Sequence, residues 1–188
     1  LKIPVDLGLR FIFPHAPFRS ITINNGMTMR AWYDIMSLDR TGVQDEDGIR
    51  QSALMVESLI EKENKRGIES ERIIIAGFSQ GGAIALHSAL RCPQRLGGLL
   101  ALSTYLPLEF TLKNDVIENE KSQSRELPIF LAHGQYDPVI QFNLGVQTRI
   151  MLEEMKYSVL WNEYPMDHAV CQDEIKDIGL WISKILMS

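Results

Sequence analysis

Arg72-Ile73-Ile74-Ile75-Ala76 is an apolar run rich in β-branched residues, and Gly77-Phe78-Ser79-Gln80-Gly81 follows it directly. The run is typical of a strand buried on both faces, and the small residues 82–90 favour a helix that ends before Pro93. A Gly-x-Ser-x-Gly pattern between strand and helix predicts a sharp turn that presents the serine hydroxyl at the carboxyl edge of a sheet. The flanking glycines permit the close approach that a Cβ atom would obstruct. The alternative is a glycine-rich turn whose serine has no chemical role.

Strand-like and helical segments alternate along the whole chain, which predicts a mostly parallel sheet with helices on both faces. We expect one domain over residues 1–188. The expected strands are residues 10–13, 72–76, 98–102, 128–132 and 158–164. The expected helices are residues 45–66, 82–90 and 143–155, with a last helix that carries Ile175, Ile178, Ile182 and Ile185 along one face. A long loop to about Met29 and a polar surface excursion over residues 111–126 complete the expected outline.

Composition excludes several functional classes. The net charge is -5 and no cluster of basic residues occurs, so nothing favours nucleic acid as a partner. No apolar run approaches the roughly 18 residues that span a bilayer, so we expect no stable membrane insertion. Cys92 and Cys171 fit neither a disulfide framework nor a zinc pattern, which favours a reducing, cytoplasmic location. The chain opens with Leu1 rather than Met, which leaves a lost targeting sequence open.

Three candidate catalytic residues follow three of the expected strands. Ser79 comes first, Asp137 follows residues 128–132, and His168 follows residues 158–164. Reacting groups in an open α/β sheet collect beyond the carboxyl ends of its strands. A serine needs a base such as imidazole, and the imidazole needs an acceptor on its other nitrogen. The order Ser79, Asp137, His168 is that expected for a serine on this turn, so we predict nucleophile, orienting carboxylate and base respectively.

The other histidines are weaker candidates for the base. His87 lies two turns into the expected helix, where packing or surface exposure is the better interpretation. His133 precedes the Asp loop and favours a structural role in a turn. His15 follows the first expected strand and could line the site. Asp167 is a poor candidate to orient its neighbour His168, because adjacent residues seldom orient one another's rings.

An oxyanion site needs donors for the charge that develops on the substrate carbonyl. The backbone N–H of Gln80, next after the nucleophile, is predicted to be one donor. The second is expected from the loop after an earlier strand, in a segment of the His-Gly-x-Gly type. The sequence holds one His-Gly pair, His133-Gly134, and it belongs to the Asp loop. The second donor is therefore missing from the chain.

These motifs, in this order, resemble the bacterial carboxylesterase and acyl-protein thioesterase family of α/β-hydrolases. The resemblance runs from about residue 9 to the C-terminus and rests on residues 10–17, 25–27, 29–34, 77–83, 102–107, 133–134, 137–139, 164–166 and 168. It implies the α/β-hydrolase fold and hydrolysis of carboxylic or thiol esters. It also implies Ser79, Asp137 and His168 as the triad, and no metal or cofactor. Asp167 departs from the family, whose members often carry Gly before the histidine.

The N-terminal region departs further from that family. Its members begin with additional strands, and the one bearing the oxyanion loop lies between the strands at 10–13 and 72–76. A gap there leaves backbone groups unpaired, at a cost on the order of 1–3 kcal/mol for each group. We therefore expect that N-terminal strands are missing from this chain and that an extension precedes Leu1. If the chain starts at Leu1, the two bordering strands would have to pair directly, and the lost donor would lower kcat by about 10²–10³.

The acyl pocket is predicted to be walled by Trp32, Met29 and Leu106, with ordinary core packing as the alternative. The main functional prediction is a serine carboxylesterase that acts on a small ester or acylated substrate. The alternatives are an acyl-protein thioesterase, a lysophospholipase, or a catalytically impaired binding protein with a hydrolase-like fold. Nothing in the sequence supports a hydrolase acting on C–C or peptide bonds, and a homodimer is left open.

Overall fold

The computed structural model describes residues 3, 8–37, 42–118 and 126–187. In chain order the elements are β1 (Phe18–Ile21), η1 (Thr22–Asn24), β2 (Met27–Arg30), α1 (Glu46–Lys65), η2 (Ser70–Arg72), β3 (Ile74–Phe78), α2 (Gln80–Arg91), β4 (Gly98–Leu102), α3 (Glu109–Glu118), β5 (Pro128–Gly134), α4 (Phe142–Glu154), β6 (Ser158–Tyr164) and α5 (Gln172–Met187).

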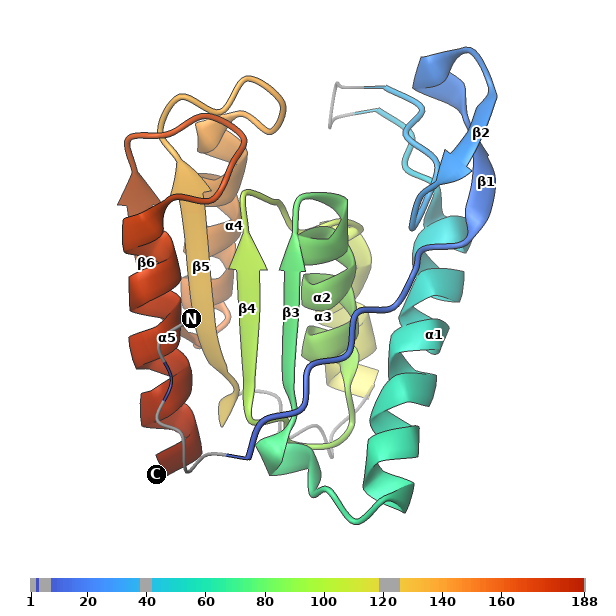
Figure 1. Ribbon diagram of the computed structural model, residues 1–188. Coiled ribbons are helices and arrows are strands. Elements are labelled where there is room, and N and C mark those ends of the chain that lie inside the picture. The colour runs from blue at the N-terminus through green and yellow to red at the C-terminus, as the bar shows by residue number, and fades with distance from the viewer. Residues whose placement is uncertain (1–2, 4–7, 38–41, 119–125, 188) are drawn as a thin grey trace.

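A four-stranded parallel sheet in the order β3-β4-β5-β6 lies at the centre of the molecule (Figure 1). Its register pairs residues 74–78 with 98–102, then 99–102 with 129–132, and 128–134 with 158–164. Because the strands are parallel, their carboxyl ends meet at one edge, which is the upper edge in Figure 1. The expected alternation of strands and helices is confirmed over this part of the chain.

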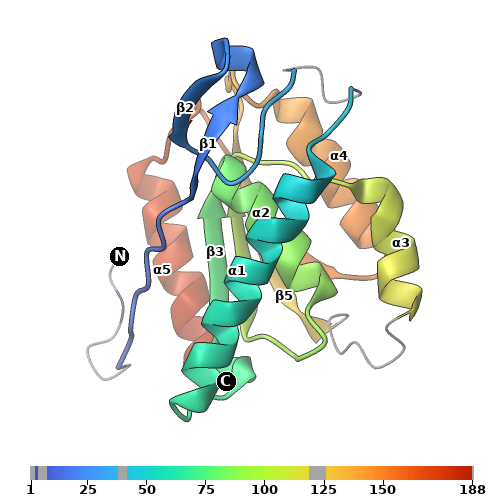
Figure 2. The same cartoon turned by 90° about the vertical axis from the view of Figure 1, so that its right-hand side faces the viewer.

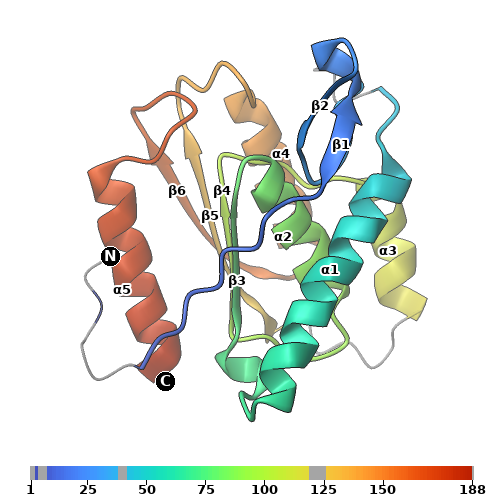
Figure 3. The ribbon, with the colours of Figure 1, turned by 45° about the vertical axis from the view of Figure 1, so that its right-hand side comes forward.

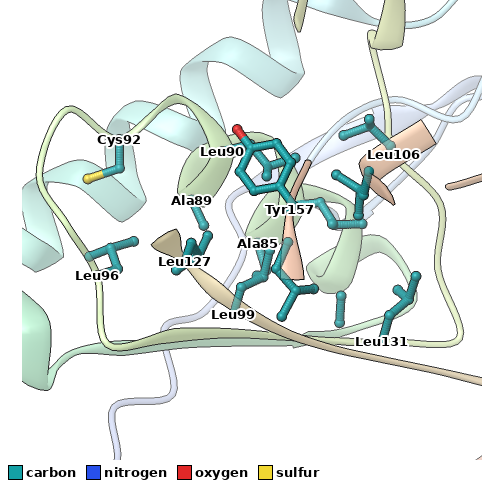
Figure 4. Packing of buried hydrophobic residues seen from close by; sticks show 14 of the residues in the cluster. Ala85, Ala89, Leu90, Cys92, Leu96, Leu99, Leu106, Leu127, Leu131 and Tyr157 are labelled. Atoms are coloured by element: carbon teal, nitrogen blue, oxygen red, sulfur yellow. The ribbon is translucent and has the colours of Figure 1, made fainter. Parts of the chain in front are cut away.

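Helices cover both faces of the sheet. Figure 2 views the sheet from its β3 edge, with α5 on one side and α1, α2 and α4 on the other. Side chains alternate along β4 to match, since Leu99 and Ala101 join the cluster of α2 and α4, while Leu100 and Leu102 join that of α5. Figure 4 shows the first cluster, in which Leu99 packs with Ala85 and Leu90 of α2. Full burial of such a leucine contributes roughly 1.5–3 kcal/mol.

The helix expected at residues 45–66 is α1. The Asp45 side chain caps it by accepting the N–H of Gly48 at 2.9 Å. Ile49 and Ile60 of its apolar stripe are buried against the core. The chain leaves the helix through Gly67, whose φ of +89° suits glycine.

The long loop expected up to Met29 is wrong, because this stretch contains a β-hairpin. β1 and β2 pair antiparallel, from Phe18 with Arg30 to Ile21 with Met27. Asn25 and Gly26 both adopt positive φ, and the N–H of Gly26 donates to Ile21 O at 3.0 Å. Asn-Gly is a strong local signal for a hairpin turn, and the sequence analysis overlooked it.

The strand expected at residues 10–13 is also wrong. Residues 8–17 have no regular secondary structure, and Phe11 and Phe13 are 56% and 85% exposed. Figure 3 shows this segment crossing toward β1 in front of β3. A strand needs a neighbouring strand to receive its backbone hydrogen bonds, and residues 10–13 pair with no other described segment. The two segments bordering the expected gap therefore do not pair directly.

The expectation that residues 72–76 form a strand buried on both faces needs correction in two respects. The strand runs from Ile74 to Phe78, directly into Ser79, and it lies at an edge of the described sheet. Ala76 and Phe78 are exposed as a result. β-branched content indicates a strand but does not report how many neighbours that strand has.

The polar stretch expected as a surface excursion at residues 111–126 begins within a helix, α3, and its part at 119–125 lies outside the described residues. Leu112 anchors α3 in the core. Cys92 and Cys171 are both free thiols. Within the described part of the chain, no helix combines the length and apolar character needed to cross a bilayer.

Candidate active site

Ser79 occupies the turn between β3 and α2 with φ 55° and ψ -123°. A non-glycine residue in this conformation costs on the order of 1–3 kcal/mol, so its surroundings must hold it in place. The N–H of Ser79 donates to Leu102 O at 2.9 Å, and Thr104 Oγ1 donates to Ser79 O at 2.8 Å. Two bonds from β4 and the segment after it thus fix the backbone on which the hydroxyl stands.

The glycines around Ser79 are not equivalent. A Cβ atom on Gly77 would lie 2.2 Å from Gly81 O, and one on Gly82 would lie 2.8 Å from Thr104 Cγ2. A Cβ atom on Gly81 would meet its nearest neighbour, Trp32 Nε1, at the ordinary distance of 3.7 Å. The close approach that we attributed to the glycines flanking the serine therefore requires Gly77 and Gly82, whereas Gly81 has room for a methyl group.

Ser79, His168 and Asp137 form a continuous chain of hydrogen bonds. His168 Nε2 lies 2.9 Å from Ser79 Oγ, and His168 Nδ1 lies 2.7 Å from Asp137 Oδ2. A carboxylate can only accept, so the proton of the neutral ring sits on Nδ1 and Nε2 is free to accept from the serine. The structure brings together three residues from three separate loops, in the arrangement that a serine nucleophile needs.

Asp137 is fully buried and its carboxylate is held from several sides. Oδ1 accepts the N–H groups of Val139 and Ile140, each at 2.8 Å, so Oδ2 points at His168. His133 Nε2 lies 3.5 Å from the same Oδ2, but it is also 2.8 Å from Ile140 O. Burial lowers the pKa of His133, so this ring is neutral near pH 7 and adds no second cation beside Asp137.

The His168 ring is also positioned by packing. Its centroid lies 4.7 Å from that of Phe78, the last residue of β3, with the planes tilted by 44°. The side chain of His168 keeps 16% of its exposure, while that of Asp137 has none. The ring therefore lies between a buried carboxylate and the Ser79 hydroxyl and keeps part of its own surface open.

Gln80 contributes a feature that sequence reasoning missed. Its backbone N–H is at the start of α2, where the helix dipole favours negative charge, as expected for an oxyanion donor. Its side chain reaches the segment after β2, where Oε1 accepts the N–H of Trp32 at 2.7 Å and Nε2 donates to Tyr33 O at 2.8 Å. No sequence signal announces these bonds, because both partners are backbone groups of an irregular segment.

The three residues predicted to wall the acyl pocket lie in different settings. Trp32 is half-buried beside the start of α2, as its 3.7 Å approach to the Gly81 position shows. Met29 is half-buried on β2 of the hairpin. Leu106 is 3% exposed and packs in the core cluster of α2 and α4, and its N–H donates to Thr148 Oγ1.

The remaining histidines are placed away from this chain of bonds. His15 is exposed in the irregular segment before β1. His87 is buried within α2, where desolvation, followed by the charges of Arg91 and Arg50, lowers its pKa to about 3. Among the described residues, no group of three or more His, Cys, Asp or Glu side chains is arranged to hold a metal ion.

A parallel sheet whose carboxyl edge carries a strand–serine–helix turn, with Asp and His loops beside it, defines an α/β-hydrolase. A family model described as Phospholipase/Carboxylesterase matches residues 5–186, and the chain belongs to this family of esterases and thioesterases. Acyl-protein thioesterase 1 of Neurospora crassa is 44% identical over 184 residues, covering 95% of this chain and 74% of that protein. Acyl-protein thioesterase 1 of Yarrowia lipolytica is 37% identical, covering 94% and 78%.

Solved structures agree with this assignment. The crystal structure of Arabidopsis thaliana SOBER1 superposes with a TM-score of 0.85 at 31% identity, covering 93% of this chain and 83% of that one. That of Zea mays acyl-protein thioesterase 2 superposes with a TM-score of 0.84 at 28% identity, covering 92% and 80%. The α/β-hydrolase fold and the family expected from the motifs are confirmed.

Proposed function

We propose that this protein is a serine hydrolase that cleaves acyl thioesters and esters through an acyl-enzyme on Ser79. The observation that carries the proposal is the hydrogen-bonded chain from Ser79 Oγ through His168 to Asp137. In this proposal Ser79 is the nucleophile, His168 the general base and acid, and Asp137 the group that holds the imidazole in the required tautomer.

In the first half of the reaction, Ser79 Oγ attacks the acyl carbonyl carbon while His168 Nε2 takes the hydroxyl proton. The carbonyl oxygen becomes an oxyanion, which accepts the backbone N–H of Gln80. The tetrahedral intermediate then collapses and the bond to sulfur or oxygen breaks. His168 gives its proton to the departing thiol or alcohol, which leaves an ester of Ser79.

In the second half, water replaces the departed group. His168 Nε2 takes a proton from the water, whose oxygen attacks the acyl carbon, and the same N–H stabilises the second oxyanion. Collapse releases the carboxylic acid and returns the proton to Ser79 Oγ. Asp137 stays ionised throughout and stabilises the imidazolium that forms twice in each cycle.

For the substrate, we favour an acyl-protein thioester over the simple carboxylic ester of our main sequence interpretation. The relatives that share 37–44% of their residues with this chain over most of its length are named acyl-protein thioesterase 1. Ester and thioester cleavage use the same oxyanion chemistry, so a carboxylesterase activity on small esters is expected to accompany it.

The test combines an activity-based probe with a lipidated substrate. An alkyl fluorophosphonate is expected to label wild-type protein, and a palmitoylated cysteine peptide is expected to release palmitate. Ser79→Ala should abolish both signals. Ser183→Ala is the matched control, because the Ser183 hydroxyl donates to Gly179 O within α5.

Two results would change the assignment. Turnover that survives in Ser79→Ala would refute the proposed nucleophile. Wild-type protein that neither labels nor hydrolyses any ester would instead support a binding protein with a hydrolase fold. Hydrolysis of p-nitrophenyl esters without release of palmitate would restore the carboxylesterase interpretation.

A further inference from the structure

The segment after β2 carries Trp32 to the site, yet it has no secondary structure of its own. Residues 31–36 are irregular between β2 and α1. A backbone without a ladder must have its N–H and C=O groups satisfied by other means. Its backbone bonds to the hairpin region, from the Ala31 N–H to Pro17 O at 3.1 Å and from the Ile23 N–H to Ile35 O at 2.9 Å, and side chains of α1 and α2 complete its bonds at Trp32.

Side chains from two helices supply those bonds at Trp32. Gln80 Oε1 accepts the Trp32 N–H, and Ser52 Oγ of α1 donates to the Trp32 C=O. Gln80 Nε2 donates onward to Tyr33 O at 2.8 Å. The amide of Gln80 thus spans two consecutive residues as a neighbouring strand would. A flipped amide would oppose N–H to N–H and oxygen to oxygen, so the geometry allows one orientation.

Gln80 is also the residue whose backbone N–H stands next to Ser79. One residue therefore joins the reacting end of the site, through its main chain, to the segment bearing Trp32, through its side chain. In Figure 2 the β1–β2 hairpin lies above the start of α2, which is where this connection is made. The Trp32 side chain packs against the core cluster that contains Tyr33, Ala83 and Leu108.

We propose that the Gln80 side chain is a positioning residue for acyl-chain selectivity, because it fixes Trp32 as one wall of the acyl site. This inference rests on the proposed hydrolysis at Ser79. It separates the two parts of Gln80, since the main chain acts on every substrate and the side chain acts only where a chain is long enough to reach Trp32. Loss of the Gln80 side chain should therefore lower kcat/KM for long acyl esters more than for short ones.

The test compares p-nitrophenyl octanoate with p-nitrophenyl acetate in Gln80→Met, which keeps the length of the side chain and removes both hydrogen bonds. Each buried methylene is worth about fourfold in kcat/KM. If one or two methylenes of the octanoyl chain lose their contact with Trp32, the octanoate/acetate ratio of kcat/KM should fall about 4- to 16-fold. The change should appear mainly as a higher KM for octanoate, with a smaller change in KM for acetate.

Gln94→Met is the matched control. Gln94 also accepts two side-chain hydrogen bonds, from Asn64 and Ser70, but at the far end of α2. Gln94→Met should leave the octanoate/acetate ratio of kcat/KM at the wild-type value. Ser52→Ala frees the other backbone group of Trp32 and should lower the ratio in the same direction as Gln80→Met. This second variant keeps the test open if Gln80→Met fails to fold.

A double-mutant cycle tests whether the Gln80 side chain affects acyl-chain selectivity through Trp32. In a Trp32→Ala background, Gln80→Met should change the ratio less than twofold, since the wall is already gone. An equal loss for octanoate and acetate, or a full effect without Trp32, would overturn the inference while leaving hydrolysis at Ser79 intact. A wild-type protein that turns over neither ester and resists fluorophosphonate would overturn the proposed function, and this inference with it.

Discussion

Two adjacent glycines of α2 should respond in opposite ways to the same substitution. Gly81→Ala places a methyl group in ordinary contact, with Trp32 Nε1 at 3.7 Å. Gly82→Ala places one 2.8 Å and 2.9 Å from two carbons of Thr104 and 3.0 Å from Gly77 O. Carbon atoms pack at about 3.5–4.0 Å, so α2 and Thr104 must separate by about 1 Å. Thr104 cannot simply rotate, because its hydroxyl holds Ser79 O.

The two substitutions share the gain of replacing glycine in a helix, about 1 kcal/mol, so the difference between them isolates the clash. Overpacking of this kind costs about 1–3 kcal/mol. For a domain of this size, 1 kcal/mol corresponds to about 2–4 °C, so Tm of Gly82→Ala should lie roughly 2–12 °C below that of Gly81→Ala.

Thermal unfolding followed by circular dichroism measures the difference, with urea titrations as an independent check. Gly82→Ala should also lower kcat for p-nitrophenyl acetate, since the displaced Thr104 releases the backbone of Ser79. Equal Tm values, or a Gly81→Ala variant that is the less stable of the two, would refute this account of the turn.

Three further substitutions test the site and the buried charges. Asp137→Asn turns an N–H toward His168 Nδ1 and forces the other tautomer, so kcat for ester hydrolysis should fall about 10²–10⁴ with little change in Tm; unchanged kcat would exclude the orienting role. Burial raises the pKa of Glu174 from 4.5 to about 7, against a smaller lowering effect of the Cys171 backbone. Between pH 4.5 and about 7 the Glu174 carboxyl is protonated in the folded state and ionised in the unfolded state, so the free energy of unfolding falls as pH rises through this range. The free energy of unfolding of Glu174→Gln relative to wild type should therefore rise by about 1.4 kcal/mol per pH unit in this window, measured in urea at pH 5 and 7.5; a constant difference would contradict it. Burial lowers the pKa of His87 from 6.5 to about 3, so the unfolded chain binds the extra proton and stability falls as pH drops below 6.5. His87→Leu should gain about 2 kcal/mol on wild type between pH 7 and 5, and no gain in urea titrations would show that the ring protonates within the fold.

The sheet and the three loops at its edge could be predicted because each depends on local pattern. Residues 98–102 and 158–164 are strands with the expected bounds, since apolar runs of that length have few other ways to be buried. Ser79, Asp137 and His168 follow from chain order once strands end where the pattern says. Parallel strands then bring their loops to one edge without further information.

The wrong predictions concern contacts between segments that lie far apart in the sequence. Residues 10–13 have the composition of a strand, but a strand also needs a partner, and no property of the run itself supplies one. β3 likewise has β-branched residues yet stands at an edge. The bonds of Gln80 to Trp32 and Tyr33 were unpredictable for a related reason, because they join a side chain to backbone groups 47 and 48 residues away.

Ser79 follows one border strand of the four-stranded sheet, and His168 follows the opposite border strand, 89 residues later in the chain. During translation the hydroxyl thus leaves the ribosome long before its proposed base has been made. A nascent polypeptide, or one cut short anywhere in that interval, carries Ser79 without His168, its proposed base. In the proposed mechanism, hydrolysis therefore becomes possible only once the loop after β6 has been made.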